Sequence, residues 1–146
     1  MQQAGPAAAL ALVVLGSTAC AATPTDAPAF LAHRSDAVQR VFADVVLGYA
    51  FEQKCTHLTS SARDGYEREL NGASRVFAGY TMAKEWVSSA AEASAYQEEM
   101  VLSASNYAGG QPCNAQSEAR VDAGLDAAEN FMSLVDGEMS KPLVVD

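Results

Sequence analysis

Two cysteines set the strongest constraint on what this chain can fold into. The sequence holds three cysteines, and Cys20 lies in an apolar N-terminal segment that has the pattern of an export leader. If the leader is removed, only Cys55 and Cys113 remain. Paired cysteines tend to oxidise in the compartments that exported proteins enter, so the sequence predicts a Cys55–Cys113 disulfide. The alternative is a cytosolic protein with two free, buried thiols.

The leader pattern occupies residues 1–21. Its apolar run, residues 7–15, is shorter than the roughly 20 residues that span a bilayer, but it suits the middle of a signal peptide. Ala19-Cys20-Ala21 then gives the small-x-small pattern for cleavage after Ala21. Residues 1–6 contain no lysine or arginine, which departs from the usual pattern. We predict a signal peptide over residues 1–21.

Cys20 allows a second interpretation. Ser17-Thr18-Ala19-Cys20 is similar to the site at which bacterial lipoproteins are cleaved, so Cys20 is a candidate for lipidation and the signal would end before it. Ser17 stands where such sites usually have leucine. A third interpretation makes residues 1–22 a buried helix of a cytosolic protein. Simple export predicts a periplasmic or secreted protein, and lipidation predicts a membrane-anchored lipoprotein.

The charge and composition bound the partners and the core. The net charge is −9, and no charged residue precedes Asp26, so cleavage leaves the charge unchanged. An acidic surface repels phosphates, which argues against nucleic acid and anionic membrane surfaces as partners. Much of the apolar fraction is alanine, which buries little area and gives a thin core. A disulfide between Cys55 and Cys113 would close a long loop and contribute about 4 kcal/mol to the free energy of unfolding. That is a large share of a typical stability of about 5–15 kcal/mol.

The apolar residues recur at three- and four-residue steps, which predicts an all-α fold. We expect one small bundle of three to four helices over residues 35–136, after a linker at residues 22–34 and before a flexible tail at residues 137–146. The first helix should begin at Ser35 as its N-cap and end near Cys55. Its predicted inner residues are Val38, Val41, Phe42, Val45, Tyr49 and Phe51. Mature-chain transmembrane segments are not expected.

The middle of the chain leaves one alternative open. Residues 57–61 are either a break between two helices or a bend in one long helix. A second apolar stripe follows to about Ala78, and Gly65 and Gly72 inside it suggest close helix contact. Gly79 is expected to end this helix in the left-handed conformation, and Thr81 to cap the next. The residues predicted to line the inner side here are Leu58, Ala62, Tyr66, Leu70, Ala73 and Phe77.

Two further helices complete the expected bundle. One runs from about Met82 to Asn106, with Trp86, Val87, Ala90, Ala93, Ser94, Met100, Val101 and Ala104 on its inner side. After a loop at residues 107–112, Asn114 is a good N-cap for the last helix, which should run to about Val135 and end at Gly137. Its predicted inner residues are Val121, Leu125, Ala128, Phe131, Met132 and Val135.

Three landmarks carry a resemblance to a known family. They are Cys55, the Gly79-Tyr80-Thr81 step and Cys113, and the similarity spans roughly residues 45–135. The chain resembles a family of small, exported, all-helical bacterial proteins of unknown function. In that family one cysteine lies late in the first helix, a second lies just before the last helix, and a Gly-Tyr-Ser/Thr step opens a long helix between them. The resemblance implies no activity.

The residue types that carry chemistry give few candidates. His57, near Cys55, is expected to be a partly exposed helix residue, and its side-chain type makes it a candidate pH sensor. A zinc site or a nucleophilic cysteine–histidine pair would need Cys55, which the disulfide uses. The acidic sets on predicted helix faces are interpreted as solvated surface: Asp122, Asp126 and Glu129 in one, and Glu92, Glu98 and Glu99 in the other. We predict no metal, no cofactor and no catalytic residues.

The function expected from these features is non-catalytic. We expect an exported protein of the bacterial cell envelope with a binding or structural accessory role, whose partner is a protein or a small molecule. The first alternative is a periplasmic chaperone that unfolds in acid, with His57 and the acidic helices as titrating groups. The second is a lipoprotein held to the membrane through Cys20.

Overall fold

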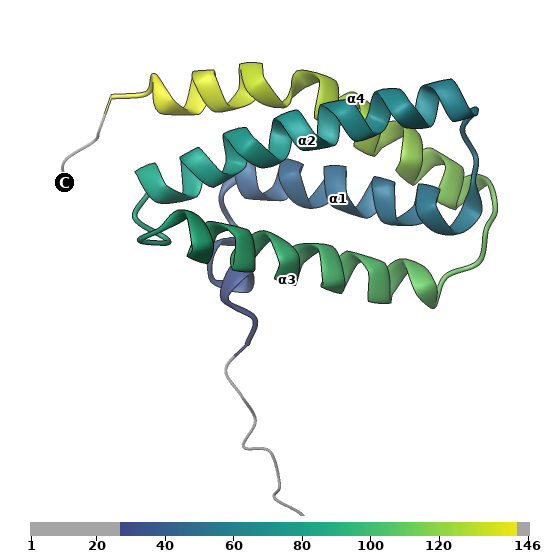
Figure 1. Ribbon diagram of the computed structural model, residues 1–146, viewed down its shortest axis with the longest axis horizontal. Helices are drawn as coiled ribbons and strands as arrows, with labels where there is room; N and C mark the ends of the chain where they lie inside the picture. The colour runs from purple at the N-terminus through teal and green to yellow at the C-terminus, as the bar shows by residue number, and fades with distance from the viewer. Residues whose placement is uncertain (1–26, 143–146) are drawn as a thin grey trace, which may run out of the picture.

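The computed structural model describes residues 27–142. A short 3₁₀ helix, η1 (Ala29–His33), precedes four α-helices: α1 (Ala37–Cys55), α2 (Ser60–Ala83), α3 (Ala90–Gly109) and α4 (Ala115–Met139) (Figure 1). No strand occurs within these residues, so the predicted all-helical bundle is confirmed. The predicted signal segment, Cys20 and the linker up to residue 26 lie outside the described residues, as do residues 143–146.

Helix α1 is the centre of the bundle. It contacts α2, α3 and α4, whereas α3 and α4 have almost no contact with each other. In Figure 1, α1 runs between α2 and α3, and α4 crosses behind α2. Phe42 of α1 stacks on Phe77 of α2 with ring centroids 4.1 Å apart, and Phe131 of α4 lies 5.7 Å from Phe42. These three fully or almost fully buried rings join three of the helices into one core.

Glycines let α1 and α4 approach at the backbone. A Cβ on Gly48 would lie 2.7 Å from the Arg120 carbonyl oxygen and 2.8 Å from the Cα of Gly124. The close helix contact expected at Gly65 and Gly72 is wrong. A Cβ at Gly72 would meet nothing within 4 Å, and one at Gly65 would meet only the side-chain end of Arg68, on the same helix, at 3.7 Å. The glycines that matter for packing are therefore on α1 and α4 rather than α2.

The first helix begins one residue later than predicted. Asp36, not Ser35, is the N-cap of α1, and its Oδ1 accepts a hydrogen bond from the Gln39 backbone N–H at 3.1 Å. Its Oδ2 also accepts from the Tyr80 hydroxyl at 2.8 Å. A carboxylate that serves two donors on two helices is a stronger cap here than the neighbouring serine.

The segment before α1 forms part of the fold. Residues 29–33, which lie in the predicted linker, form η1. The Gln39 amide donates to the Phe30 carbonyl, and the Ala29 N–H donates to Glu99 Oε1 at 3.2 Å. His33 stacks on Trp86 with centroids 4.0 Å apart. These contacts fix η1 against α1 and α3 and place Phe30 beside both helices.

The connection between α1 and α2 is a break between two helices. The sequence had left open whether it was such a break or a bend in one long helix. The α1 C-cap, Thr56, adopts a left-handed conformation with φ 52°, and the Thr59 side chain caps α2 by accepting from the Ala62 N–H at 3.3 Å. A left-handed threonine is unusual, so the side chains that hold this loop must over-determine it.

The predicted break at Gly79-Tyr80-Thr81 is wrong. Helix α2 runs through these residues to Ala83, because Tyr80 and Thr81 continue its buried stripe after Phe77. The helix ends instead in a Schellman motif, in which the Trp86 N–H donates to the Thr81 carbonyl at 3.0 Å. Glu85 takes the left-handed position, with φ 58°, that glycine usually fills.

The start of α3 therefore moves to Ser89. The Ser89 hydroxyl accepts from the Glu92 N–H at 3.2 Å, and Glu92 accepts from the N–H of Ser88 at 2.6 Å. Of the predicted inner residues, Ala93, Met100 and Ala104 are buried, but Ala90, Ser94 and Val101 are exposed. Tyr96, which was not predicted, is buried and donates to Gln39 Oε1.

Helix α4 begins as predicted and ends later. Asn114 is its N-cap and forms a capping box with Ser117, which confirms the predicted start. The predicted end at Gly137 is wrong, since the helix continues to Met139. The prediction that Met132 is a core residue is also wrong, because this residue is 56% exposed.

Candidate functional site

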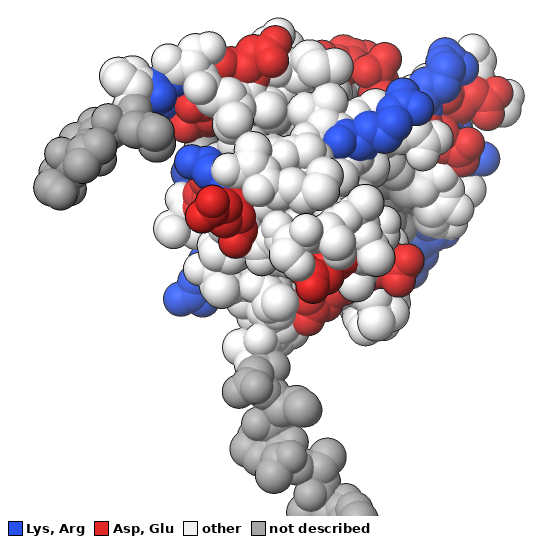
Figure 2. Space-filling model, turned by 60° about the vertical axis from the view of Figure 1, so that its left-hand side comes forward, with Lys and Arg blue, Asp and Glu red and all other residues white. Residues whose placement is uncertain are grey.

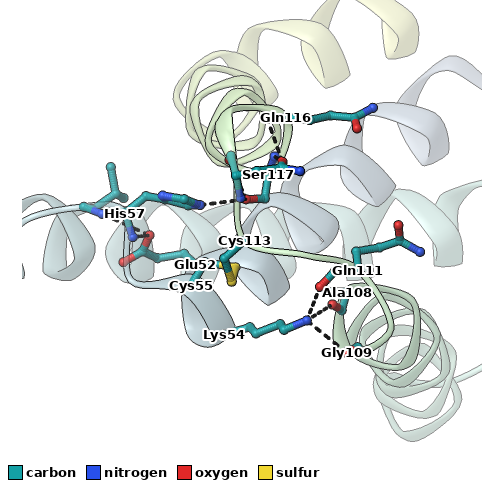
Figure 3. Close-up of a disulfide and its surroundings, with 12 residues drawn as sticks. Glu52, Lys54, Cys55, His57, Ala108, Gly109, Gln111, Cys113, Gln116 and Ser117 are labelled. Atoms are coloured by element: carbon teal, nitrogen blue, oxygen red, sulfur yellow. Dashed lines mark hydrogen bonds between the residues drawn. A yellow bond between two sulfur atoms is a disulfide. The ribbon is translucent and has the colours of Figure 1, made fainter.

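The two cysteines meet at one end of the bundle. The Sγ atoms of Cys55 and Cys113 lie 1.99 Å apart and the Cα atoms 5.5 Å apart, across a sequence separation of 58 (Figure 3). This is the spacing of a disulfide bond. It connects the last residue of α1 to the residue before the N-cap of α4. Cys113 is exposed and Cys55 half-buried, so the bond lies near the surface.

Glu52 organises the loop beside this bond. It is fully buried in α1, and its carboxylate accepts from the backbone N–H groups of His57 at 2.9 Å and Leu58 at 3.1 Å. It also pairs with Arg63 Nε of α2 at 2.8 Å. A charge is tolerated in a core only with such a full set of partners. Glu52 was not predicted, and the one sequence signal for it is its place on the inner side of α1.

Lys54 caps a neighbouring helix. Its Nζ donates to the carbonyl oxygens of Ala108 at 3.1 Å and Gly109 at 3.0 Å, and also to that of Gln111 (Figure 3). These carbonyls belong to the C-terminal end of α3, where a helix leaves acceptors unsatisfied and carries a partial negative charge. Lys54 therefore fixes the end of α3 against the end of α1.

His57 is a loop residue rather than the predicted helix residue. It follows Thr56 in the α1–α2 connection, and its Nε2 lies 2.8 Å from Ser117 Oγ in the first turn of α4. Ser117 is itself buried and caps α4 with Asn114. Residues 52–57 thus hold the ends of α1 and α3 and the starts of α2 and α4. Their polar groups serve as helix caps, and the Ser117 hydroxyl donates to the Asn114 carbonyl at 2.7 Å within the same cap.

The acidic residues form no compact ligand set. Among residues 27–142, no group of three or more His, Cys, Asp or Glu residues is placed to hold a metal ion. Asp122, Asp126 and Glu129 are exposed along α4. The Ser88 N–H and hydroxyl, which donate to Glu92, hold the pKa of its carboxyl below the usual value. Figure 2 shows acidic and basic groups scattered around an uncharged central area on one end of the molecule.

An apolar groove opens where α3 and α4 diverge over α1. Its volume is about 310 Å³, within the range of small-molecule sites but at the low end. Ala43, Val46 and Leu47 of α1 line it, together with Met100 and Ala104 of α3. Phe30 of η1 also lines it, so the docking of η1 on α1 and α3 completes this surface.

Polar groups gather where the groove meets a second hollow. Arg120 of α4 is the sole charged residue lining the groove, and Tyr107 of α3 lines it as well. The same two residues line a small hollow of about 50 Å³ beside the start of α4, with Gln111, Asn114 and Gln116. No ion pair within residues 27–142 involves Arg120. The two hollows together are apolar along the bundle and polar near the disulfide.

Comparison with protein-family models, curated proteins and solved structures finds no match for the chain. Within the described residues, every helix is too short or too polar to cross a membrane. Two features of the described residues are candidate sites. One is the disulfide junction at residues 52–57, and the other is the apolar groove with Arg120.

Proposed function

We propose that this protein is a non-catalytic binding protein that works outside the cytosol, and that the apolar groove over α1 is its binding site. The observation that carries the proposal is the groove itself. It is lined by side chains of α1, α3 and η1, with a few polar groups at one end, which is the usual anatomy of a small-molecule site. The disulfide junction supports it by fixing the ends of α1 and α3, two helices that line the groove.

Two observations support an extracytoplasmic location. The cysteine pair is placed for a disulfide, and such bonds persist in oxidising compartments. The N-terminal sequence has the pattern of a signal peptide. Intact mass of the protein recovered from the native host tests this step. We expect a chain that begins at Ala22 and lacks the two hydrogens of the thiols. An uncleaved chain with free thiols would contradict export, and a lipid-sized mass on Cys20 would establish the lipoprotein alternative.

Binding in the groove can be tested with a neutral apolar probe, N-phenylnaphthylamine, whose fluorescence rises in apolar surroundings. We expect saturable binding to the wild-type protein. The variant Ser103→Trp places a large side chain in the groove from an exposed position of α3, and it should abolish binding. The matched control is Ser105→Trp, also exposed on α3 but directed to a different face.

The outcomes separate clearly when the melting temperature of each variant is measured as well. Loss of binding in Ser103→Trp alone, with both variants folded, supports the groove as the site. Equal binding by wild-type and Ser103→Trp protein would show that the probe binds elsewhere. No binding by the wild-type protein would overturn the proposed site.

An acid-responsive chaperone is the second candidate, and Glu52 favours it. This buried carboxylate holds the α1–α2 loop through three donors, so the loop depends on a single charged group in the core. The test is aggregation of a model client at about pH 2–3, where carboxylates are protonated. A chaperone would lose its tertiary signal and suppress aggregation. A protein that stays rigid, or that leaves the client to aggregate, would remove this candidate.

A further inference from the structure

The groove has a polarity that narrows the class of ligand. Its long side is formed by aliphatic and aromatic groups of α1, α3 and η1. Its one charged residue is Arg120, which stands at the junction with the small hollow beside α4. An apolar groove with a single cation, Arg120, at one end is complementary to a molecule that has an apolar chain and one anionic end. We propose that the groove binds a free single-chain amphiphile with a carboxylate head group, such as a fatty acid, and that Arg120 binds the carboxylate.

Arg120 is suited to this role by its chemistry and its surroundings. A guanidinium can donate two parallel hydrogen bonds to a carboxylate. Within residues 27–142 no ion pair engages the Arg120 side chain, so its guanidinium charge remains available for a ligand. Tyr107 adds a hydroxyl at the same junction. The first turn of α4, which carries the positive end of the helix dipole, lines the small hollow through Asn114, Gln116 and Ser117.

The net charge of the protein restricts where an anionic ligand can bind. At −9 the chain as a whole repels anions and attracts cations. An anionic ligand would therefore bind only where a local cation outweighs that field, and Arg120 is the one such residue on the groove. A cationic amphiphile of equal chain length would be favoured by the whole surface but opposed by Arg120. The sign of the preferred head group thus reports directly on the proposed contact.

The size of the groove limits the apolar part. Its α3 side runs from Met100 to Tyr107, which is about 10 Å at the helical rise of roughly 1.5 Å per residue. With a volume of about 310 Å³, the groove accommodates one short chain rather than a lipid with two. Each methylene that enters the groove should tighten binding roughly three- to fourfold until the groove is full.

This inference rests on the proposed function, because it names the ligand of the same groove. The experiment measures displacement of N-phenylnaphthylamine from the full mature chain by octanoate, decanoate and dodecanoate, all kept monomeric. Dodecanol and dodecyltrimethylammonium serve as neutral and cationic probes of equal chain length. We expect the carboxylates to compete, with affinity rising from octanoate, and dodecanoate to bind at least roughly tenfold more tightly than either control.

The variant Arg120→Gln isolates the head-group contact. It should weaken dodecanoate binding about tenfold and leave dodecanol binding unchanged. Its matched control is Arg75→Gln, which removes the same charge from an exposed position of α2 away from the groove and should change neither.

The results distinguish the assignment of the carboxylate to Arg120 from the proposal that the groove is a binding site. If dodecanol binds as tightly as dodecanoate, or if Arg120→Gln affects both alike, the carboxylate assignment is overturned while the groove remains a binding site. Tighter binding of dodecyltrimethylammonium would overturn it as well. If Ser103→Trp protein keeps all of these affinities, the groove is not the site and the proposed function falls with the inference.

Discussion

Gly48 of α1 and Gly124 of α4 lie backbone against backbone at the crossing of the two helices. A Cβ on Gly48 would come within 2.8 Å of the Gly124 Cα, and a Cβ on Gly124 within 2.9 Å of the Gly48 Cα. The Tyr66 hydroxyl of α2 covers the crossing and donates to the Val45 carbonyl at 2.9 Å. Backbone atoms cannot move aside as a side-chain tip can, so this contact fixes how closely α4 packs on α1.

The substitutions Gly48→Ala and Gly124→Ala should therefore destabilise the protein, although alanine is the better helix former. We expect each to lower the free energy of unfolding by roughly 1–3 kcal/mol, the usual cost of overpacking. The control Gly72→Ala adds a methyl group in open space within α2 and should raise it by about 0.5–1 kcal/mol. Urea unfolding of the three variants tests the contrast, and a gain in stability for Gly48→Ala would contradict the close crossing.

The Cys55–Cys113 bond should supply a large part of the stability. Reduction, or the double substitution Cys55→Ser with Cys113→Ser, is expected to cost up to about 4 kcal/mol because the unfolded chain regains a long open loop. The shift of the urea midpoint on adding a reductant measures this. The double serine variant is the control and should not respond to the reductant. If the reductant leaves the urea midpoint of the wild-type protein unchanged, the thiols are free.

Glu52→Gln should weaken the α1–α2 junction. An amide of the same shape keeps one acceptor but turns two donors toward groups that also donate, so the free energy of unfolding should fall by roughly 1–3 kcal/mol. The control is Glu69→Gln on the exposed side of α2, which should stay within about 0.5 kcal/mol. Hydrogen exchange at the His57 and Leu58 amides gives a local readout. Unchanged protection of both amides would mean that Glu52 does not hold the loop.

Stability should fall in strong alkali because of four tyrosines. Burial, followed by the hydrogen bond to Glu67, raises the pKa of Tyr49 to about 12. Burial is also the main cause of the raised pKa values of Tyr66, Tyr80 and Tyr96. The unfolded chain loses these protons first, near pH 10, so the stabilisation is complete below that pH and is lost as the pH rises toward the folded-state values.

Urea unfolding at a series of pH values, with tyrosinate absorbance followed in parallel, measures that loss. The variant Tyr66→Phe removes one titrating group and should show a shallower decline above about pH 10. A free energy of unfolding that stays constant through this range would contradict the raised pKa values.

Helix ends show where sequence reasoning succeeds and where it fails. Asn114 is a polar N-cap followed three residues later by Ser117, and the structure confirms the start of α4 there. Ser89 and Glu92 form the same kind of N-cap pattern, in which a serine is followed three residues later by a glutamate. This pattern could have identified the start of α3 from the sequence. The glycine at 79 was the misleading one, because a glycine that ends a helix and a glycine inside one look alike in sequence.

Helix α1 ends at Cys55, near where the sequence placed its end, but the residues that terminate α1 and α2 could not be identified from local preference. Both finish on a non-glycine residue in the left-handed conformation, Thr56 and Glu85. Such residues are disfavoured there by a clash with their own Cβ, and they persist because surrounding contacts over-determine them. At Thr56 those contacts include Glu52, whose partners come from the following loop and from Arg63 of α2.

The sequence by itself determined the helical class, the cysteine pair and the inner face of α1. These follow from periodicity, from cap residues and from counting cysteines, all of which act within a short stretch or need no coordinates. The tertiary structure alone decided the Gly48–Gly124 crossing, the burial of Glu52 and the groove that Arg120 lines. Each of these depends on groups far apart in the chain meeting in space, and a linear pattern carries no information about which helix face will find which partner.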